Sequence, residues 1–337
     1  MTQKDIQAIK ELLSEKKNIV IVHHKNADGD AIGSSVALNS YLNLCGHRSN
    51  IISPNNFPEF LKWLDNKKEI MIFNNSKNQI NLIKTADIIF TLDFNHLDRC
   101  GDMTDLVNGS SAIKILIDHH ENPSNYADYM YSDTEISSTC EMVYHFVGKL
   151  GDNSKINSSI AEAIYTGIMT DTGSFKFSST SSVTHKVVSD LIDKGADKTK
   201  IHNEIYDNNR IEKIKLLSYA LSKIEVIDEY NTSFISLSQN DLNKFDFKKG
   251  DTEGIVNYGL SINEIKFAAI FIEDAKEKII KISFRSKGDF DVNKFSRDNF
   301  NGGGHKNASG AISRDSMSST ITNFKNALKN YKTELNI

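Results

Sequence analysis

The chain alternates short, uniformly apolar runs with segments whose apolar residues recur at helical spacing. Residues 4–16 follow the helical spacing and predict an opening amphipathic helix. Residues 18–23, Asn-Ile-Val-Ile-Val-His, show no polar alternation, so they predict a strand that is buried on both faces. A helix rich in small residues is predicted over 31–44, and further strands over 86–92 and 112–117. Strands that alternate with helices in this way predict a parallel α/β sheet.

The pattern changes in the second half of the chain. Residues 156–170 predict a helix, and 183–223 predict two more helices that are separated near 195–197. From residue 224 onward, the alternation of polar and apolar residues is typical of strands. These strands are predicted over 224–227, 232–237, 265–272 and 278–284. We therefore predict a first domain over 1–185, a helical linker over 186–223 and a smaller α+β domain over 224–337.

Composition narrows the classes of function. Forty basic and 44 acidic residues give a net charge of −4, which disfavours binding of long duplex nucleic acid. No stretch approaches the roughly 20 apolar residues of a membrane span, and residues 1–17 lack the apolar core of a signal peptide. The three scattered cysteines match neither a disulfide framework nor a zinc motif. A cytoplasmic protein without membrane partners is expected.

Acidic and histidine side chains gather where the predicted strands and helices end. In parallel sheets, ligands bind beyond the carboxyl ends of the strands. Several carboxylates at one point repel each other unless cations hold them together, so the pattern predicts a metal cluster. The candidate residues are His24, Asp28, Asp30, Asp93, Asp118, His119, His120 and Asp171.

Each of these segments also has a simpler explanation. Asp28 and Asp30 are compatible with a turn or a helix cap, and Asp93 and Asp171 with caps. Adjacent histidines at 119 and 120 point in different directions, so one is free to bind a cation while the other faces substrate. Asp118 is suited to orient a histidine. The joint order of the four segments favours the metal cluster over four independent structural roles.

A glycine-rich segment in the second half suits an anion. Gly302, Gly303 and Gly304 allow backbone N–H groups to approach a phosphate closely, and His305 adds a charge or a hydrogen bond. The alternative is a flexible turn. Nearby, Arg285 and Ser286 end a predicted strand with a guanidinium that is suited to bidentate phosphate contact. Cys140 lies in an apolar helical pattern and is predicted to be core rather than a nucleophile.

These motifs carry a family resemblance. The order His-x₃-Asp-x-Asp, Asp, Asp-His-His, Asp, from His24 to Asp171, resembles the DHH phosphoesterase superfamily. The segment Gly302–His305 resembles the glycine-rich motif of the DHH-associated carboxyl-terminal domain. The chain is most similar to the compact two-domain branch of bifunctional oligoribonucleases (nanoRNases) and pAp phosphatases. The one local departure, Asn26-Ala27 in the first loop, does not affect a ligand.

The resemblance implies a role for each matching residue. One metal would be held by His24, Asp28 and Asp93. The other would be held by Asp30, Asp93, His119 and Asp171, with Asp93 as the catalytic bridge. His120 would be catalytic beside the scissile phosphate. The residues implied to contact the rest of the substrate are Arg99, Arg285, Ser286, Gly303, Gly304 and His305.

The resemblance also implies the activity. We expect a parallel-sheet DHH domain joined by a helical linker to an α+β substrate-binding domain, with the active site in the cleft between them. Two divalent cations, with Mn²⁺ favoured by the mixed histidine and carboxylate donors, would hydrolyse short oligoribonucleotides and 3′-phosphoadenosine 5′-phosphate (pAp). Alternatives are a phosphodiesterase of linear or cyclic dinucleotides, such as pApA or c-di-AMP, and a non-catalytic nucleotide-binding regulator. Pyrophosphate and polyphosphate are disfavoured by the glycine–histidine motif. The oligomeric state is open, a homodimer included.

Overall fold

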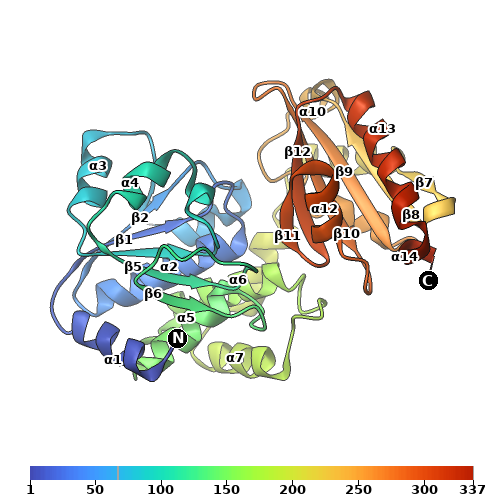
Figure 1. The fold of residues 1–337 in the computed structure, drawn as a ribbon. Coiled ribbons are helices and arrows are strands. Elements are labelled where there is room, and N and C mark those ends of the chain that lie inside the picture. The colour runs from blue at the N-terminus through green and yellow to red at the C-terminus, as the bar shows by residue number, and fades with distance from the viewer. Residues whose placement is uncertain (67, 337) are drawn as a thin grey trace. The chain divides into compact units, whose positions relative to one another are not determined.

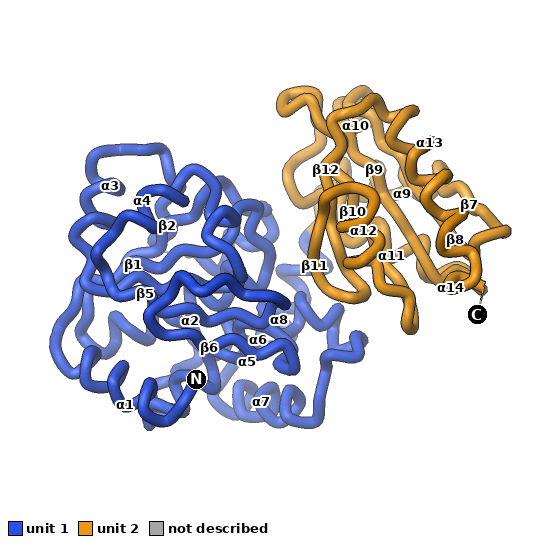
Figure 2. The backbone as a smooth tube through the Cα atoms, in the orientation of Figure 1, with its two compact units in different colours: residues 1–208 blue, residues 209–337 orange. Residues whose placement is uncertain are grey.

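The computed structural model describes residues 1–66 and 68–336 (Figure 1). The chain folds into two compact units, 1–208 and 209–337 (Figure 2). The segment predicted as a linker, 186–223, contributes helices to both units. Among the described residues, no helix has both the length and the apolar character that a membrane crossing requires.

The first unit is built on a six-stranded sheet in which every strand pairing is parallel. The predicted parallel sheet is therefore confirmed. The strand order is β3-β2-β1-β4-β5-β6. The strands are β1 (Asn18–His23), β2 (Arg48–Ser53), β3 (Ile70–Ile72), β4 (Ile88–Leu92), β5 (Ile113–Asp118) and β6 (Tyr129–Ser132).

Helices pack on both faces of this sheet (Figure 1). The α-helices are α1 (Gln3–Leu12), α2 (Gly29–Leu44), α3 (Lys77–Lys84), α4 (Thr104–Asn108), α5 (Thr139–Lys149), α6 (Ser158–Asp171), α7 (Ser182–Asp193) and α8 (Lys198–His202). Shorter turns are the 3₁₀ helices η1 (Glu59–Asp65), η2 (Leu97–Met103) and η3 (Asn153–Lys155), and the π-helix η4 (Asn203–Asp207).

The continuous apolar run of β1 has a direct structural cause. Ile19 and Ile21 belong to the core that the sheet shares with α2, α5 and α6. Val20 and Val22 belong to a second core with α3, η2 and α4 on the opposite face. Successive side chains of a strand point to opposite faces, so a sheet covered on both sides needs an apolar residue at every position.

The strand order places a switch point beside β1. From β1 the chain continues to β2 on one side, and it later returns to β4 on the other side. In open parallel sheets, the loops leaving two such strands diverge and open a crevice for ligands. His24 follows β1, and Asp93 follows β4. Two of the predicted ligands therefore start from the position where this fold binds ligands.

The second unit contains a mixed six-stranded sheet of order β11-β12-β10-β9-β8-β7, in which only the β8–β9 pair is parallel. Its strands are β7 (Glu225–Ile227), β8 (Thr232–Leu237), β9 (Phe267–Asp274), β10 (Ile279–Ser286), β11 (Gly303–His305) and β12 (Ala308–Ser313). Its helices are α9 (Ile211–Ser222), η5 (Asp228–Tyr230), α10 (Gln239–Lys244), α11 (Ile255–Leu260), α12 (Val292–Phe300), α13 (Met317–Leu328), η6 (Lys329–Tyr331) and α14 (Lys332–Asn336).

This second sheet also buries both faces. One face carries a phenylalanine-rich core to which α12, α13 and α14 contribute, and the other packs against α9, α10 and α11. Phe267 contacts the rings of Phe284, Phe295 and Phe324 at centroid distances of 5.6, 4.9 and 5.6 Å. Ring pairs at such distances add to the burial of apolar area. The smaller unit therefore has a core of its own.

One helical prediction was wrong. Residues 183–223 were predicted as two helices, but the chain forms α7, then α8 running into η4, and then α9. The additional break lies at Arg210, whose extended backbone (φ −64°, ψ 146°) precedes α9. The Arg210 guanidinium donates to Asp251 at 2.7 Å and to Asp246 at 3.3 Å within the second unit. The periodicity of apolar residues cannot predict these contacts, because they join residues that are far apart in the sequence.

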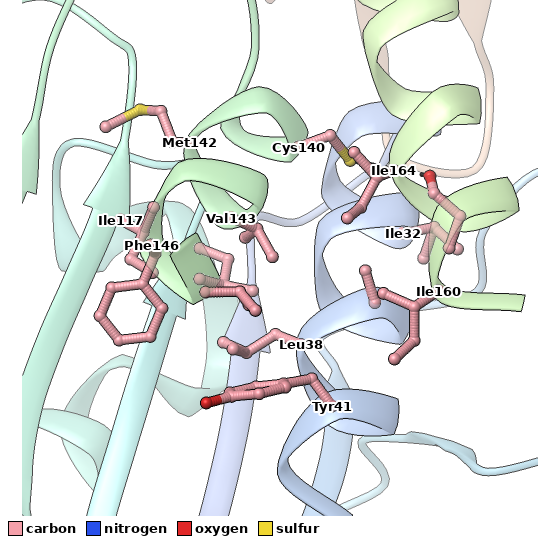
Figure 3. Close-up of a cluster of buried hydrophobic side chains, with 14 of the residues drawn as sticks. Ile32, Leu38, Tyr41, Ile117, Cys140, Met142, Val143, Phe146, Ile160 and Ile164 are labelled. Carbon is pink, nitrogen blue, oxygen red and sulfur yellow. Dashed lines mark hydrogen bonds between the residues drawn. The ribbon is translucent and has the colours of Figure 1, made fainter. Parts of the chain in front are cut away.

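Buried side chains of α2, α5 and α6 pack against one another (Figure 3). Two glycines allow these helices to approach closely. A Cβ atom at Gly33 would lie 2.6 Å from the carbonyl oxygen of Ala163. A Cβ atom at Gly167 would lie 2.1 Å from Sγ of Cys140 and 2.8 Å from a carboxylate oxygen of Asp30. Cys140 is fully buried, so its predicted place in the core is confirmed. The helix contact therefore also sets the surroundings of Asp30.

We predict that Gly167→Ala lowers the free energy of unfolding by about 1–3 kcal/mol, because the added methyl group overpacks the contact with Cys140 and Asp30. Urea denaturation measures the change. Gly148→Ala is the matched control, since its Cβ would meet only the side chain of Asn153, at 3.0 Å or more. Equal stability of the Gly167→Ala variant and the native chain would contradict the close packing.

Candidate metal centre

The loop after β1 presents a histidine to two carboxylates. The Nδ1 atom of His24 lies 2.9 Å from the carbonyl oxygen of Lys25. A carbonyl only accepts, so Nδ1 carries the proton and Nε2 keeps its lone pair in the neutral ring. That Nε2 lies 3.8 Å from Asp28 Oδ2 and 3.4 Å from Asp93 Oδ2. The first three predicted ligands are thus brought together.

Asp28 serves two purposes at once. Its Oδ1 accepts hydrogen bonds from the backbone N–H groups of Asp30 and Ala31, both at 3.1 Å, and so caps α2. Its Oδ2 is the oxygen that faces His24. The capping role considered from the sequence is therefore real, and it leaves one oxygen available to a cation.

Asp93 lies between two groups of donors. Its Oδ2 faces His24, and its Oδ1 lies 3.6 Å from Nε2 of His119. The residue is 2% exposed and has a left-handed backbone (φ 63°). Such a conformation is uncommon for a residue with a Cβ atom and is found at functional sites. The carboxylate divides its oxygens between the two groups, as a bridging ligand would.

The second group of donors converges on His119. Its Nδ1 lies 3.3 Å from the carbonyl oxygen of Ile136, which again leaves Nε2 with the lone pair. This Nε2 lies 3.8 Å from Asp30 Oδ2 and 3.5 Å from Asp171 Oδ2. Asp171 is the last residue of α6, where the helix dipole disfavours a negative charge. A cation would offset that penalty.

The pKa shifts in both groups of residues indicate that positive charge is required between the carboxylates. Burial, together with the neighbouring Asp93 and Asp171 carboxylates, raises the pKa of Asp30 well above its usual value. Burial disfavours a charged His24, but Asp28 and Asp93 outweigh it and raise its pKa to about 10. Burial likewise opposes a charged His119, yet Asp171, Asp30 and Asp93 raise its pKa to about 9. The carboxylates thus demand positive charge.

The donor atoms suit divalent cations. Two donors that are each about 2.1 Å from one ion lie about 3.0–3.4 Å apart at octahedral or tetrahedral angles. The four distances of 3.4–3.8 Å that relate His24 to Asp93, and His119 to Asp30, Asp93 and Asp171, are close to this spacing. They exceed the usual hydrogen-bond range. The residues therefore fit two groups of metal ligands that share Asp93, and the assignment of ligands stays a prediction.

His120 has a different partner. Its Nδ1 lies 2.7 Å from Asp118 Oδ1, and Asp118 is fully buried at the end of β5. The carboxylate holds the ring in the tautomer that carries hydrogen on Nδ1. The same Nδ1 is 3.7 Å from Asp93 Oδ1. His120 therefore lies beside the cluster with an orienting carboxylate behind it, as the sequence indicated for Asp118.

The predicted phosphate-binding residues divide between the two units. Arg99 lies in η2 of the first unit, where its carbonyl oxygen accepts a 2.7 Å hydrogen bond from the N–H of Lys25 in the loop after β1. In the second unit, Arg285 of β10 and His305 of β11 both pair with Ala308 of β12. Directly opposed residues share a face of the sheet, so Arg285 and His305 lie in one row on one side.

The glycine segment is a strand rather than a flexible turn. Gly303 and Gly304 pair with Gly310 and Ser309. Gly304 has φ 148°, and a Cβ atom there would lie 2.5 Å from the carbonyl oxygen of Ala308. Ser286 uses its hydroxyl within the fold, donating to the carbonyl oxygen of Phe290 at 2.6 Å. Its predicted contact with substrate stays a prediction, as does the cleft between the units.

Sequence reasoning missed the start of α5. Both oxygens of Asp30 accept backbone hydrogen bonds there, from Thr139 at 2.6 Å and from Cys140 at 2.8 Å. The signal was present, because Ser138 and Glu141 form the S-x-x-E pattern of a helix start. Ser138 indeed caps the helix by accepting from the N–H of Glu141 at 3.1 Å. The pattern predicts the helix but not the carboxylate that the helix would contact.

Comparison with known proteins agrees with this geometry. The family model "DHH family, N-terminal domain" matches residues 18–168, and the model "DHHA1 domain" matches residues 230–335. The probable bifunctional oligoribonuclease and PAP phosphatase NrnA of Streptococcus mutans is 30% identical over 319 residues, which cover 91% of this chain and 94% of that protein. The chain belongs to the DHH family.

Two further proteins extend the comparison of this DHH protein. The bifunctional oligoribonuclease and PAP phosphatase NrnA of Bacillus subtilis is 28% identical over 294 residues, covering 87% of this chain and 88% of that protein. The crystal structure of an exopolyphosphatase-related protein from Bacteroides fragilis covers 100% of this chain and 98% of its own, with 40% identity and a TM-score of 0.94. The predicted enzyme class, a phosphoric ester hydrolase, is confirmed by this membership.

We predict that Asp93→Asn in this DHH protein weakens the binding of both cations, because the shared ligand loses its charge. The measurement is metal content after loading with Mn²⁺ and desalting, with less than one ion retained per chain. Asp98→Asn is the matched control, since Asp98 is an exposed carboxylate in the same segment. Retention of two ions by the Asp93→Asn chain would refute the shared-ligand arrangement.

We predict that Asp118→Asn separates catalysis from metal binding. The substitution removes the charge that orients His120 at 2.7 Å, and loss of such a partner costs roughly 10–100-fold in activity. The two Mn²⁺ ions should remain bound, because Asp118 belongs to neither predicted group of ligands. Turnover and metal content are measured on the same sample. A chain that loses its metal together with its activity would show that Asp118 is a ligand.

Proposed function

We propose that this protein is a manganese-dependent two-metal phosphodiesterase and phosphatase that hydrolyses short oligoribonucleotides and pAp. The observation that carries the proposal is the division of the Asp93 oxygens between two groups of donors, His24 with Asp28 and His119 with its partners. A shared carboxylate of this kind suits paired cations about 3.5–4 Å apart, the arrangement of many phosphoryl-transfer sites. The activities for which the NrnA relatives are named support this substrate class.

The donor atoms support the choice of Mn²⁺. Each group combines one imidazole with carboxylates. Mg²⁺ prefers oxygen ligands and keeps its water, whereas mixed nitrogen and oxygen donors suit Mn²⁺ and other transition ions. Bound cations would polarise the phosphoryl oxygens and lower the pKa of a water.

The chain's own residues would perform the remaining steps. Asp93 would belong to both groups of ligands and so hold them next to each other. His120, whose Nδ1–H is held by Asp118, leaves its Nε2 for the substrate, and the ring would need a second proton on Nε2 to act as general acid toward the leaving oxygen. In the second unit, the row of Arg285 and His305 offers positive charge and hydrogen bonds to the far end of a short substrate. A net charge of −4 without a long basic tract agrees with substrates of a few nucleotides.

We predict that the Mn²⁺-loaded protein hydrolyses di- to pentaribonucleotides and pAp, and that Asp93→Ala lowers both rates by about 10³-fold or more. Loss of the metals removes several kcal/mol of transition-state stabilisation. Each 1.36 kcal/mol corresponds to a tenfold change in rate. Chelation should abolish turnover, and added Mn²⁺ should restore it. The assay is phosphate or mononucleotide release, with Asp98→Asn as the control.

Parallel substrates decide between this proposal and its alternatives. Faster turnover of c-di-AMP or pApA than of short RNA and pAp would favour the dinucleotide phosphodiesterase. Rapid hydrolysis of pyrophosphate or polyphosphate, with inert RNA, would overturn the choice of substrate. Binding of nucleotide without hydrolysis of any of these compounds, in a chain that holds Mn²⁺, would favour the regulatory protein.

A further inference from the structure

The start of α5 contacts ligands of both predicted cations. Thr139 donates its backbone N–H to Asp30 Oδ2 at 2.6 Å and its hydroxyl to Asp93 Oδ1 at 3.0 Å. All three side chains are at least 98% buried. Water therefore does not compete for these bonds, and a lost bond is not replaced. Thr139 has no place in either group of predicted ligands, nor in the steps proposed above.

The hydroxyl contacts Asp93 at the atom that matters for bridging. A carboxylate that serves two cations must keep its plane directed at both, yet rotation of an aspartate about χ2 is soft and broad. His24 faces Oδ2 of Asp93, whereas the Thr139 hydroxyl contacts Oδ1, the oxygen on the His119 side. The hydroxyl uses one lone pair of Oδ1 and leaves the other for a ligand bond.

We propose that Thr139 is a positioning residue that fixes the plane of the bridging Asp93 carboxylate and so makes the second cation bind. This inference rests on the two-metal arrangement proposed above and adds a residue that acts through Asp93. Without the hydroxyl, Oδ2 still faces His24 and Asp28, but Oδ1 is no longer held toward His119. The cation of the second group is therefore the one that loses affinity.

A buried network holds Thr139 in place. Ser137 donates its hydroxyl to Glu141 Oε2, and Thr184 of α7 donates to the same oxygen at 2.9 Å. Glu141 is 2% exposed, and its other oxygen lies 3.5 Å from Nε2 of His145. The turn before α5 is thus tied to α7 through one carboxylate. A rigid support of this kind is what a positioning group requires.

The test is a titration of the metal-free full chain with Mn²⁺. Calorimetry measures the two affinities, and electron paramagnetic resonance measures the coupling between the bound ions. Thr139→Val removes the hydroxyl and keeps both the shape of the side chain and the backbone N–H. The second Mn²⁺ should bind about 10–100-fold more weakly. The signal of paired, exchange-coupled Mn²⁺ should give way to that of isolated Mn²⁺. Thr139→Ser, which retains the hydroxyl, should restore both properties.

A matched control separates positioning from general destabilisation. Thr320→Val removes another fully buried hydroxyl, which donates to Ser313 in the second unit, and it should leave both Mn²⁺ affinities unchanged. If Thr139→Val does not fold, Thr139→Ala is compared with Thr139→Ser in its place. Two Mn²⁺ ions bound with native affinity and native coupling, in a folded chain without the hydroxyl, would overturn the inference.

The two proposals fail in different ways. A native chain that binds paired Mn²⁺ but hydrolyses no phosphoester loses the proposed function, while the role of Thr139 is still read from the metal titration. A native chain that hydrolyses pAp, and whose Thr139→Val variant keeps both ions, retains the proposed function and loses this inference.

Discussion

Mutual repulsion among buried carboxylates is the constraint on which this structure depends. Asp30 and Asp93 are almost fully buried, and Asp28 and Asp171 lie close by. Burial and the neighbouring charges raise the pKa of Asp30, and the same carboxylates draw the pKa of His24 and His119 upward. A fold tolerates such a concentration of charge only if cations or protons neutralise it. The Nδ1–H of each histidine is held by a backbone carbonyl, so Nε2 is the atom at which either a proton or a cation would sit among the carboxylates.

The parallel sheet creates the place where these groups meet. The loops after β1 and β4 diverge at the switch point and deliver His24 and Asp93, while β5 ends in Asp118. The helices then complete the site. Asp28 and Asp30 lie at the start of α2, and Asp171 lies at the end of α6. Because Gly33 and Gly167 allow α2, α5 and α6 to approach closely, packing in the core also sets the distances between ligands.

The second unit carries basic side chains on a sheet instead of a cluster of carboxylates. Its phenylalanine core supports a sheet whose edge strand is the glycine segment, so that Arg285 and His305 are held by backbone pairing rather than on a mobile loop. The candidate metal ligands and the row of Arg285 and His305 come from separate compact units.

The sequence by itself determined the class of fold and the family, and it named the candidate metal ligands. Apolar strands that end in aspartate and histidine are local patterns, and their order along the chain is specific. Only the tertiary structure decided how these candidate side chains face one another and which groups support them. The two oxygens of Asp93 are chemically identical in the sequence, and the role of Thr139 depends on a contact across 46 residues. The break at Arg210, whose guanidinium pairs with Asp251, was missed for the same reason. Periodicity reports which face of an element is buried, whereas pairing between distant polar atoms exists only after the elements have packed.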